Sequence, residues 1–278
     1  MNRKIMEHKT YFTKRDVFIV IACISFLLLN ISAIGSNGRE RAKRAVCLTN
    51  LNKLTAAWIL YADDNNGKLV NGAPGTNRQN EPEWVGIDWT PSYATGGQLP
   101  KDQQEESVRA GALWPYCRDL NLYHCPSGRQ GELRNYSIVD SMNGYPRPGT
   151  YIGNIGNVGT KVGQTVLWLK NISEIRTPGP AHRAVFIDEG RITPDSYAVH
   201  YLNEQWWDPV PVRHGEGTNL SFADGHAEPW TWQGKKTIEI GKMVNPWHQM
   251  LPETPEEFQD LYRMQKGVWG RLGYVPSH

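Results

Sequence analysis

Near its start the chain carries a long uncharged run, VFIVIACISFLLLNISAI, at residues 17–34. Eighteen helical residues span about 27 Å, close to the hydrocarbon thickness of a bilayer. The polar residues in the run, Ser25, Asn30 and Ser32, are small, whereas a core helix of this length would normally carry a polar face. We therefore expect a transmembrane segment at 17–34, preceded by a cytoplasmic leader at 1–16.

A secretory signal peptide is the alternative, because Ala33-Ile34-Gly35 is an acceptable cleavage site. Both the apolar run and the polar start before it are long for that role, which favours an uncleaved anchor. Charge does not settle the orientation, because the segment RERAKR at 39–44 places basic residues beyond the apolar run as well.

A helical pattern continues past the apolar run, over residues 35–67, after a weak point at Gly35-Ser36-Asn37-Gly38. Apolar residues at alternating spacings of four and three form the stripe of an amphipathic helix. These residues are Cys47, Leu51, Leu54, Trp58 and Tyr61. The polar stretch at 63–67 ends the helix, with Gly67 suited to the left-handed position.

The rest of the chain, residues 68–278, is expected to form a globular domain. Short apolar runs that read as strands alternate with long loops rich in Gly, Pro and Asn. The runs lie at 69–70, 84–87, 165–169 and 184–187. Thr254-Pro255-Glu256-Glu257 has the residues of a helix start. One long helix followed by strands predicts an α+β fold with an antiparallel sheet.

Three stretches resemble pseudopilin-like proteins of the type II secretion and type IV pilin class. Residues 39–70 resemble the helix that leads to the first strand of these proteins, and Cys125-Pro126-Ser127 resembles a recurring Cys-Pro-Ser. His214, nine further residues and then Asp224-Gly225 fit the H-x9-D-G motif associated with prepilin-type processing. The likeness covers both ends of the chain and leaves the middle unmatched.

The resemblance implies a membrane-anchored structural subunit and not an enzyme. We therefore expect no catalytic residues, no metal and no cofactor. The expected partners are the membrane and other pilin-like subunits or further copies of the chain. The implied location is the bacterial inner membrane, crossed once, with the globular domain on the extracytoplasmic side. A net charge of +2, from 30 basic and 28 acidic residues, gives no reason to expect a nucleic-acid partner.

The leader departs from the pattern of this class, in which a Gly precedes the cut and Phe-Thr-Leu-Ile-Glu follows it. Residues 12–16 align with that pentapeptide, and Phe12 and Asp16 keep its aromatic and acidic ends. Tyr11 replaces the required Gly, while Lys14 and Arg15 replace apolar residues. We interpret Tyr11, Phe12 and Asp16 as a degenerate processing site and expect the leader to stay uncut.

Three cysteines, Cys47, Cys117 and Cys125, can oxidise if the domain is extracytoplasmic. Cys117 and Cys125 could close a local loop. Cys47 and Cys125 both lie in stretches that carry the resemblance, which slightly favours that pair, and the absence of any bridge stays open. The spacing does not fit a zinc site of four cysteines, or of two cysteines and two histidines.

The motif RHGEGTNLSFADGHAEPW, at 213–230, predicts a β-hairpin with a two-residue turn at Asp224-Gly225. Such a turn pairs Ser221 with Glu228. A strand of roughly 20 Å then separates His214 from Asp224, too far for a shared metal ion. We interpret His214, Asp224 and Gly225 as structural, unless the glycine-rich loop after His214 folds it back beside the sheet.

Two other functions use residues in the same region. A hydrolase would need paired carboxylates, such as Asp188-Glu189 or Asp224 with Glu228, but adjacent strand residues point to opposite faces. A carbohydrate-binding module would use Trp206-Trp207 or Trp230-Thr231-Trp232 as a platform. A buried face explains these tryptophans equally well, so a glycan partner has no specific support.

Overall fold

The structure is a computed structural model that describes residues 13–76, 81–90, 98–145, 160–246 and 248–278, without the side chains of 27–37. It divides into two compact units, Met1–Ala42 and Lys43–His278, which are described separately. Tyr11 and Phe12 of the expected processing site lie outside the described residues.

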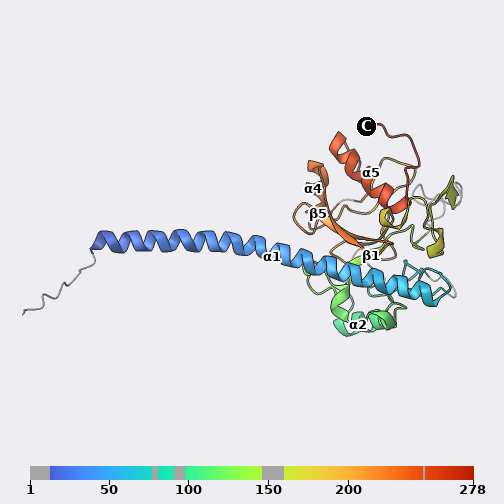
Figure 1. Cartoon of the computed structure of the whole chain (residues 1–278), viewed down its shortest axis with the longest axis horizontal. Coiled ribbons are helices and arrows are strands. Elements are labelled where there is room, and N and C mark those ends of the chain that lie inside the picture. Colours follow the sequence, from blue (N-terminus) through green and yellow to red (C-terminus); the bar gives the residue numbers. More distant parts are fainter. Residues whose placement is uncertain (1–12, 77–80, 91–97, 146–159, 247) are drawn as a thin grey trace, which may run out of the picture. The chain divides into compact units, whose positions relative to one another are not determined.

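The elements are labelled in Figure 1. The helices are α1 (Lys14–Asp64), α2 (Lys101–Ala110), α4 (Lys235–Gly241) and α5 (Pro255–Trp269), with short 3-10 turns η1 (Trp114–Tyr116), η2 (Leu120–Tyr123), η3 (Ile172–Glu174) and η4 (Pro180–His182). The strands are β1 (Tyr136–Ile138), β2 (Lys161–Val162), β3 (Thr165–Val166), β4 (Ala184–Asp188), β5 (Gly217–Phe222) and β6 (Ala227–Thr231).

Helix α1 runs through the expected weak point at 35–38 without a break. Thr13 and Asp16 cap its start, because the Thr13 N–H donates to the Asp16 carboxylate and the Asp16 N–H donates to the Thr13 hydroxyl. At its end the Gly67 N–H donates to the Ala62 carbonyl, with Gly67 at a φ of +78°. The predicted helix end is therefore confirmed.

In the first unit, the described side chains between residues 17 and 26 include large apolar groups that are exposed. They are Val17, Phe18, Ile19, Val20, Ile21, Ile24 and Phe26. Among the described residues, no helix has both the length and the apolar content that crossing a bilayer requires. Part of the expected membrane segment, the side chains of 27–34, falls outside what the structure describes.

In the second unit, the apolar stripe of α1 is part of the core. Cys47, Leu51, Leu54 and Trp58 have no exposed surface, and Tyr61 is almost fully buried. The predicted amphipathic segment is therefore confirmed. Leu60 and Val46, which lie off the stripe, are half-exposed, as expected for a helix with one buried face.

The main sheet is antiparallel, in the order β1-β4-β5-β6, and confirms the predicted α+β class. Helix α1 covers one face, where the Thr55 hydroxyl donates to the Ser221 hydroxyl across 2.6 Å. Helix α5 covers the other face, where Gly267 lies so close to the Trp230 ring that a Cβ there would sit 3.0 Å away. Because both faces are covered, all six residues of β5 are buried (Figure 1).

Several predicted strands are only partly present. Residues 184–187 form β4, but the run at 165–169 gives only the two residues of β3. The runs at 69–70 and 84–87 lie beside isolated bridges and not in named strands. Leu69, for example, donates its N–H to the Lys170 carbonyl in a loop, so its backbone is satisfied without a ladder.

The predicted helix start near residue 254 is confirmed as α5. The Thr254 hydroxyl accepts from the Glu257 N–H, and Pro255 occupies the first helical position. In contrast, α2 and β1 were not predicted. Helix α2, KDQQEESVRA, buries only Gln104 and Val108, so its sequence carries almost no apolar periodicity.

The hairpin of β5 and β6 is confirmed, but its predicted register is wrong by one residue. Ser221 pairs with Ala227, and Leu220 pairs with Glu228. The loop holds three residues, because the Phe222 N–H donates to the His226 carbonyl and Gly225 takes a φ of +98°. A shift of one residue exchanges the faces of β6. It also pairs Pro229, on the outer strand β6, with Asn219 of β5.

Candidate functional site

Four side chains with metal-ligating or catalytic chemistry meet inside the second unit. They are Cys47 of α1, Cys125 after η2, Asp188 at the end of β4 and His214 before β5. One sulfur, nitrogen or carboxylate oxygen from each lies within 4.8 Å of all the others. Three of the residues are 0% exposed and His214 is 2% exposed. We call this set the Cys-Cys-Asp-His cluster.

The contacts within the cluster link its members in a chain. Asp188 Oδ2 lies 3.2 Å from Cys47 Sγ and 3.3 Å from His214 Nε2. His214 Nε2 in turn lies 3.3 Å from Cys125 Sγ. The other ring nitrogen of His214 has no hydrogen-bond partner among the described residues. All polar contacts of the imidazole therefore run through Nε2, toward the centre of the cluster.

A tight turn holds Cys125. Its carbonyl accepts from the Gly128 N–H across 2.7 Å, and its own N–H donates to Asn135 Oδ1 across 3.1 Å. The Ser127 N–H points back at the Cys125 sulfur, 3.3 Å away. These backbone and amide contacts fix the position of the Cys125 sulfur within the Cys-Pro-Ser turn.

Backbone contacts also fix Asp188. Oδ1 accepts from the Gly190 N–H across 2.9 Å, and the Asp188 carbonyl accepts from the Thr218 hydroxyl across 2.6 Å. With Oδ1 occupied by the backbone, Oδ2 is the oxygen that faces the two sulfurs and the imidazole. The carboxylate is thus arranged to offer a single oxygen to the cluster.

His214 reaches the cluster because the chain reverses at Gly215, which has a φ of +75°. The N–H of His214 donates to the Gly217 carbonyl, and its own carbonyl accepts from the Arg44 guanidinium of α1. The glycine-rich loop therefore folds His214 back beside the sheet. This is the arrangement for which the structural interpretation of His214 makes an exception.

The members of the cluster shift one another's pKa values. Burial raises the pKa of Cys47, but hydrogen bonds from Cys125 and His214 outweigh it and the pKa is lowered. The hydrogen bond to Cys47, together with burial and Asp188, raises the pKa of Cys125. Burial lowers the pKa of His214, yet contacts with Asp188 and Cys47 bring it up to about 9.

A thiol beside an imidazole and a carboxylate is also the residue set of cysteine hydrolases. Such a nucleophile must meet its substrate, and both cysteine side chains here are without solvent access. None of the four residues lines the groove beside α5 or the hollow that Trp89 and Tyr145 line. The enclosure of all four side chains suits a site that holds a metal ion or fixes the structure.

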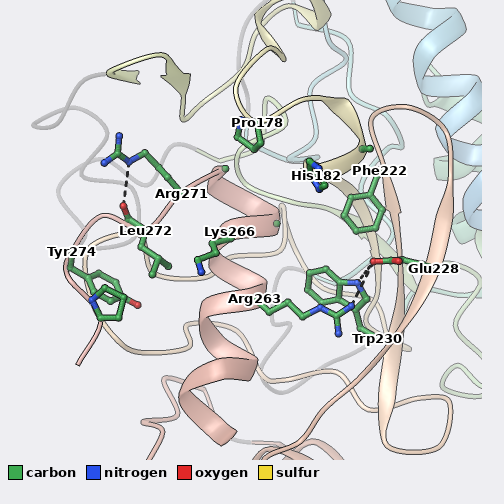
Figure 2. A pocket seen from close by; sticks show the side chains of 14 residues that line it. Pro178, His182, Phe222, Glu228, Trp230, Arg263, Lys266, Arg271, Leu272 and Tyr274 are labelled. Carbon is green, nitrogen blue, oxygen red and sulfur yellow. Dashed lines mark hydrogen bonds and ion pairs between the residues drawn. The ribbon is translucent and has the colours of Figure 1, made fainter. Parts of the chain in front are cut away.

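A separate groove of about 700 Å³ lies between the outer face of the sheet and α5 (Figure 2). Arg263 lies over the Trp230 ring, 4.0 Å from its centroid, and 3.7 Å from Glu228. The Trp230 indole N–H donates to the same Glu228. The aromatic, the cation and the carboxylate in this groove thus satisfy one another.

The residues predicted for the structural motif take separate places. His214 belongs to the Cys-Cys-Asp-His cluster, whereas Asp224 contacts the ring of His226, 2.6 Å away, on the half-exposed hairpin loop. Gly225 closes that loop. Cys47 and Cys125 are brought together, but both are free thiols in the structure, so the considered disulfide is not formed. A ligand set with a carboxylate differs from the zinc sites of four cysteines, or of two cysteines and two histidines, that the spacing excludes.

The residues of the two alternative functions are also located. Asp188 faces the cluster, whereas Glu189 accepts hydrogen bonds from Ser137 and Thr193, so the two carboxylates do not share a site. Trp206, Trp230 and Trp232 are at most 4% exposed, and Trp207 is partly buried against the core. The buried-face interpretation of Trp230 and Trp232 is confirmed.

No protein-family model, no curated protein and no solved structure matches the chain.

Proposed function

We propose that this protein is a membrane-anchored, pseudopilin-like structural subunit. The observation that carries the proposal is the composition of α1, a single helix of 51 residues. Between Cys47 and Tyr61 the helix supplies a buried stripe to the core of the second unit. Between residues 17 and 24 it presents large apolar side chains that are about half-exposed or more.

The exposed apolar residues give the proposal its physical basis. Burial of a Val, Leu, Ile or Phe side chain contributes about 1.5–3 kcal/mol. Several such residues left exposed are costly in water and favourable in hydrocarbon. The uncharged sequence continues to residue 34, which extends the apolar stretch to the length expected for a membrane anchor.

The stripe at 47–61 supports a structural role for the same helix. A helix that only anchors a domain can end in a flexible linker. Here the same helix continues, and its stripe at 47–61 is buried in the core of the domain. An extracytoplasmic domain and partners of the pilin-like kind, or further copies of the chain, follow from the sequence resemblance. The proposal therefore combines the buried stripe with a resemblance carried by three separate stretches.

The proposal is tested by extraction of membranes that contain the full chain. We expect the protein to stay in the pellet after alkaline carbonate treatment and to be released by detergent. A double substitution, Ile21→Lys with Ile24→Lys, should move it to the carbonate-soluble fraction, because charges at these depths cost about 2.5–3.5 kcal/mol each.

The matched control places the same charges on exposed apolar positions of the same helix in the second unit. Val46 and Leu60 are as exposed as Ile21 and Ile24, so Val46→Lys with Leu60→Lys should leave the protein in the pellet. Release of the unaltered protein by carbonate, or equal release of both double variants, would contradict membrane anchoring through 17–34.

A further inference from the structure

We propose that Cys47, Cys125, Asp188 and His214 bind one Zn²⁺ ion in a closed, tetrahedral, structural site. The ligand atoms would be the two Sγ atoms, Asp188 Oδ2 and His214 Nε2. The site would join α1, the Cys-Pro-Ser turn, the end of β4 and the loop before β5 through a single ion.

The distances within the cluster suit this ion. Zinc lies about 2.3 Å from sulfur, and about 2.0–2.2 Å from imidazole nitrogen or carboxylate oxygen. In a tetrahedron these bonds place nitrogen and oxygen about 3.3 Å apart, and sulfur about 3.5 Å from either of them. The structure has 3.3 Å from His214 Nε2 to Asp188 Oδ2. It has 3.2 Å and 3.3 Å for the two sulfur contacts. One ligand atom from each residue lies within 4.8 Å of all the others, so the remaining pairs must draw together where they exceed these separations.

The surroundings prepare these atoms as ligands. The Ser127 N–H is directed at the Cys125 sulfur, and the Gly190 N–H occupies the Asp188 oxygen that faces away from the cluster. Contacts of this kind orient ligands and are typical of the outer shell of metal sites. They leave one atom from each residue for the centre.

Charge supports a divalent ion that prefers sulfur. Two thiolates and a carboxylate carry −3 together, and Zn²⁺ leaves −1. Arg44 lies next to this charge, donating to the His214 carbonyl, and Arg213 experiences the charges of Asp188 and Cys125. Two thiolates and an imidazole favour zinc over magnesium or calcium, which take oxygen ligands.

The absence of solvent access identifies the type of zinc site. Catalytic zinc keeps one position open to water or substrate, whereas structural zinc has four protein ligands. Here all four residues are buried and each contributes one atom. The ion would therefore stabilise the domain and would not perform chemistry.

The test is a cobalt titration of the full chain, purified in detergent with its thiols reduced and its metal removed by a chelator. Tetrahedral Co²⁺ with thiolate ligands has strong visible absorption and a sulfur-to-cobalt charge-transfer band. We expect both signals to saturate at one equivalent and to disappear when one equivalent of Zn²⁺ is added. Zinc should also raise the melting temperature, because it binds the folded state.

Single substitutions identify the ligands. Cys125→Ser and His214→Ala should each weaken cobalt binding at least 10-fold, and Cys125→Ser should also reduce the charge-transfer band. Cys117→Ser is the matched control, since Cys117 is equally a buried free thiol but contacts Tyr123 and not the cluster. It should bind cobalt like the unaltered chain. Circular dichroism of each variant separates loss of binding from loss of folding.

If the ligand variants fail to fold, the cobalt spectrum of the unaltered chain still tests the proposal. A reduced, folded protein that gives no charge-transfer band, or only the weak spectrum of six-coordinate cobalt, would overturn the proposal. So would thiol trapping directly from membranes that finds Cys47 and Cys125 joined in a disulfide. Equal loss of binding in Cys117→Ser would place the metal elsewhere.

Discussion

At the scale of single residues, Asp88 and Arg134 form a buried ion pair in which each charge compensates the other. Both side chains are without solvent exposure, and the guanidinium contacts the two carboxylate oxygens at 2.8 Å and 2.9 Å. Arg134 also donates to the Tyr136 and Thr193 carbonyls. Removal of one partner from such a pair leaves an uncompensated buried charge.

We therefore expect Asp88→Asn to lower the free energy of unfolding by about 3–5 kcal/mol. The control is Glu105→Gln, which removes the carboxylate of an exposed pair with Arg109 on α2 and should cost less than about 1 kcal/mol. Urea unfolding of the detergent-solubilised protein measures both. Similar losses for the two variants would show that the buried pair is not held as described.

The members of the Cys-Cys-Asp-His cluster could not be assembled from the sequence. Cys47 and His214 were noted separately as parts of the resemblance, and Asp188 only as a possible catalytic acid. Their proximity in space depends on the path of α1 and of the loops, which no local sequence pattern encodes. The one available signal was that both cysteines and the histidine lay in the stretches that carry the resemblance.

At the scale of elements, α1 offers two leucines that differ mainly in burial. Leu54 is 0% exposed and Leu60 is 50% exposed, six residues apart on the same helix. We expect Leu54→Ala to lower the free energy of unfolding by about 2–5 kcal/mol, because it leaves a cavity. Leu60→Ala should change it by no more than about 0.5 kcal/mol.

Equilibrium unfolding followed by tryptophan fluorescence measures this pair, because Trp58 lies on the same buried stripe. Helix propensity is nearly equal for Leu and Ala, so the difference between the variants reports packing. Losses of the same size would mean that the stripe does not pack on the sheet in solution.

Elements with strong local signals were predicted well. The cap at Thr254 and the stripe of α1 depend on residues within a few turns of one another, and both are present. The register of β6 was wrong because Asp-Gly signals a turn without fixing its length, and one extra loop residue exchanges the faces of the strand. The apolar runs at 69–70 and 84–87 pair with loops, which local patterns do not reveal.

At the scale of the whole molecule, the α+β class was predictable because one helical stripe precedes alternating strands and turns. A further prediction concerns the N-terminus of the native protein. Because Tyr11 stands where a prepilin leader has Gly, we expect the native protein to keep residues 1–11. Mass spectrometry of the protein isolated from membranes should find the intact N-terminus. A methylated Phe12 at the N-terminus, or a start at residue 36, would contradict this expectation.

The outer strand β6 has a consequence for how copies of this protein can associate. The N–H groups of Phe222 and Trp232 take part in the ladder of the hairpin, so the N–H groups of alternate residues 227, 229 and 231 point away from it. The central one of these is Pro229, which has no N–H to offer. At the opposite edge, Tyr197 bonds to both Ile138 and Asp140 and covers β1. Pairing of strands between copies is thus disfavoured at both edges of the sheet. A fibre of such copies would have to be held by contacts other than added strands.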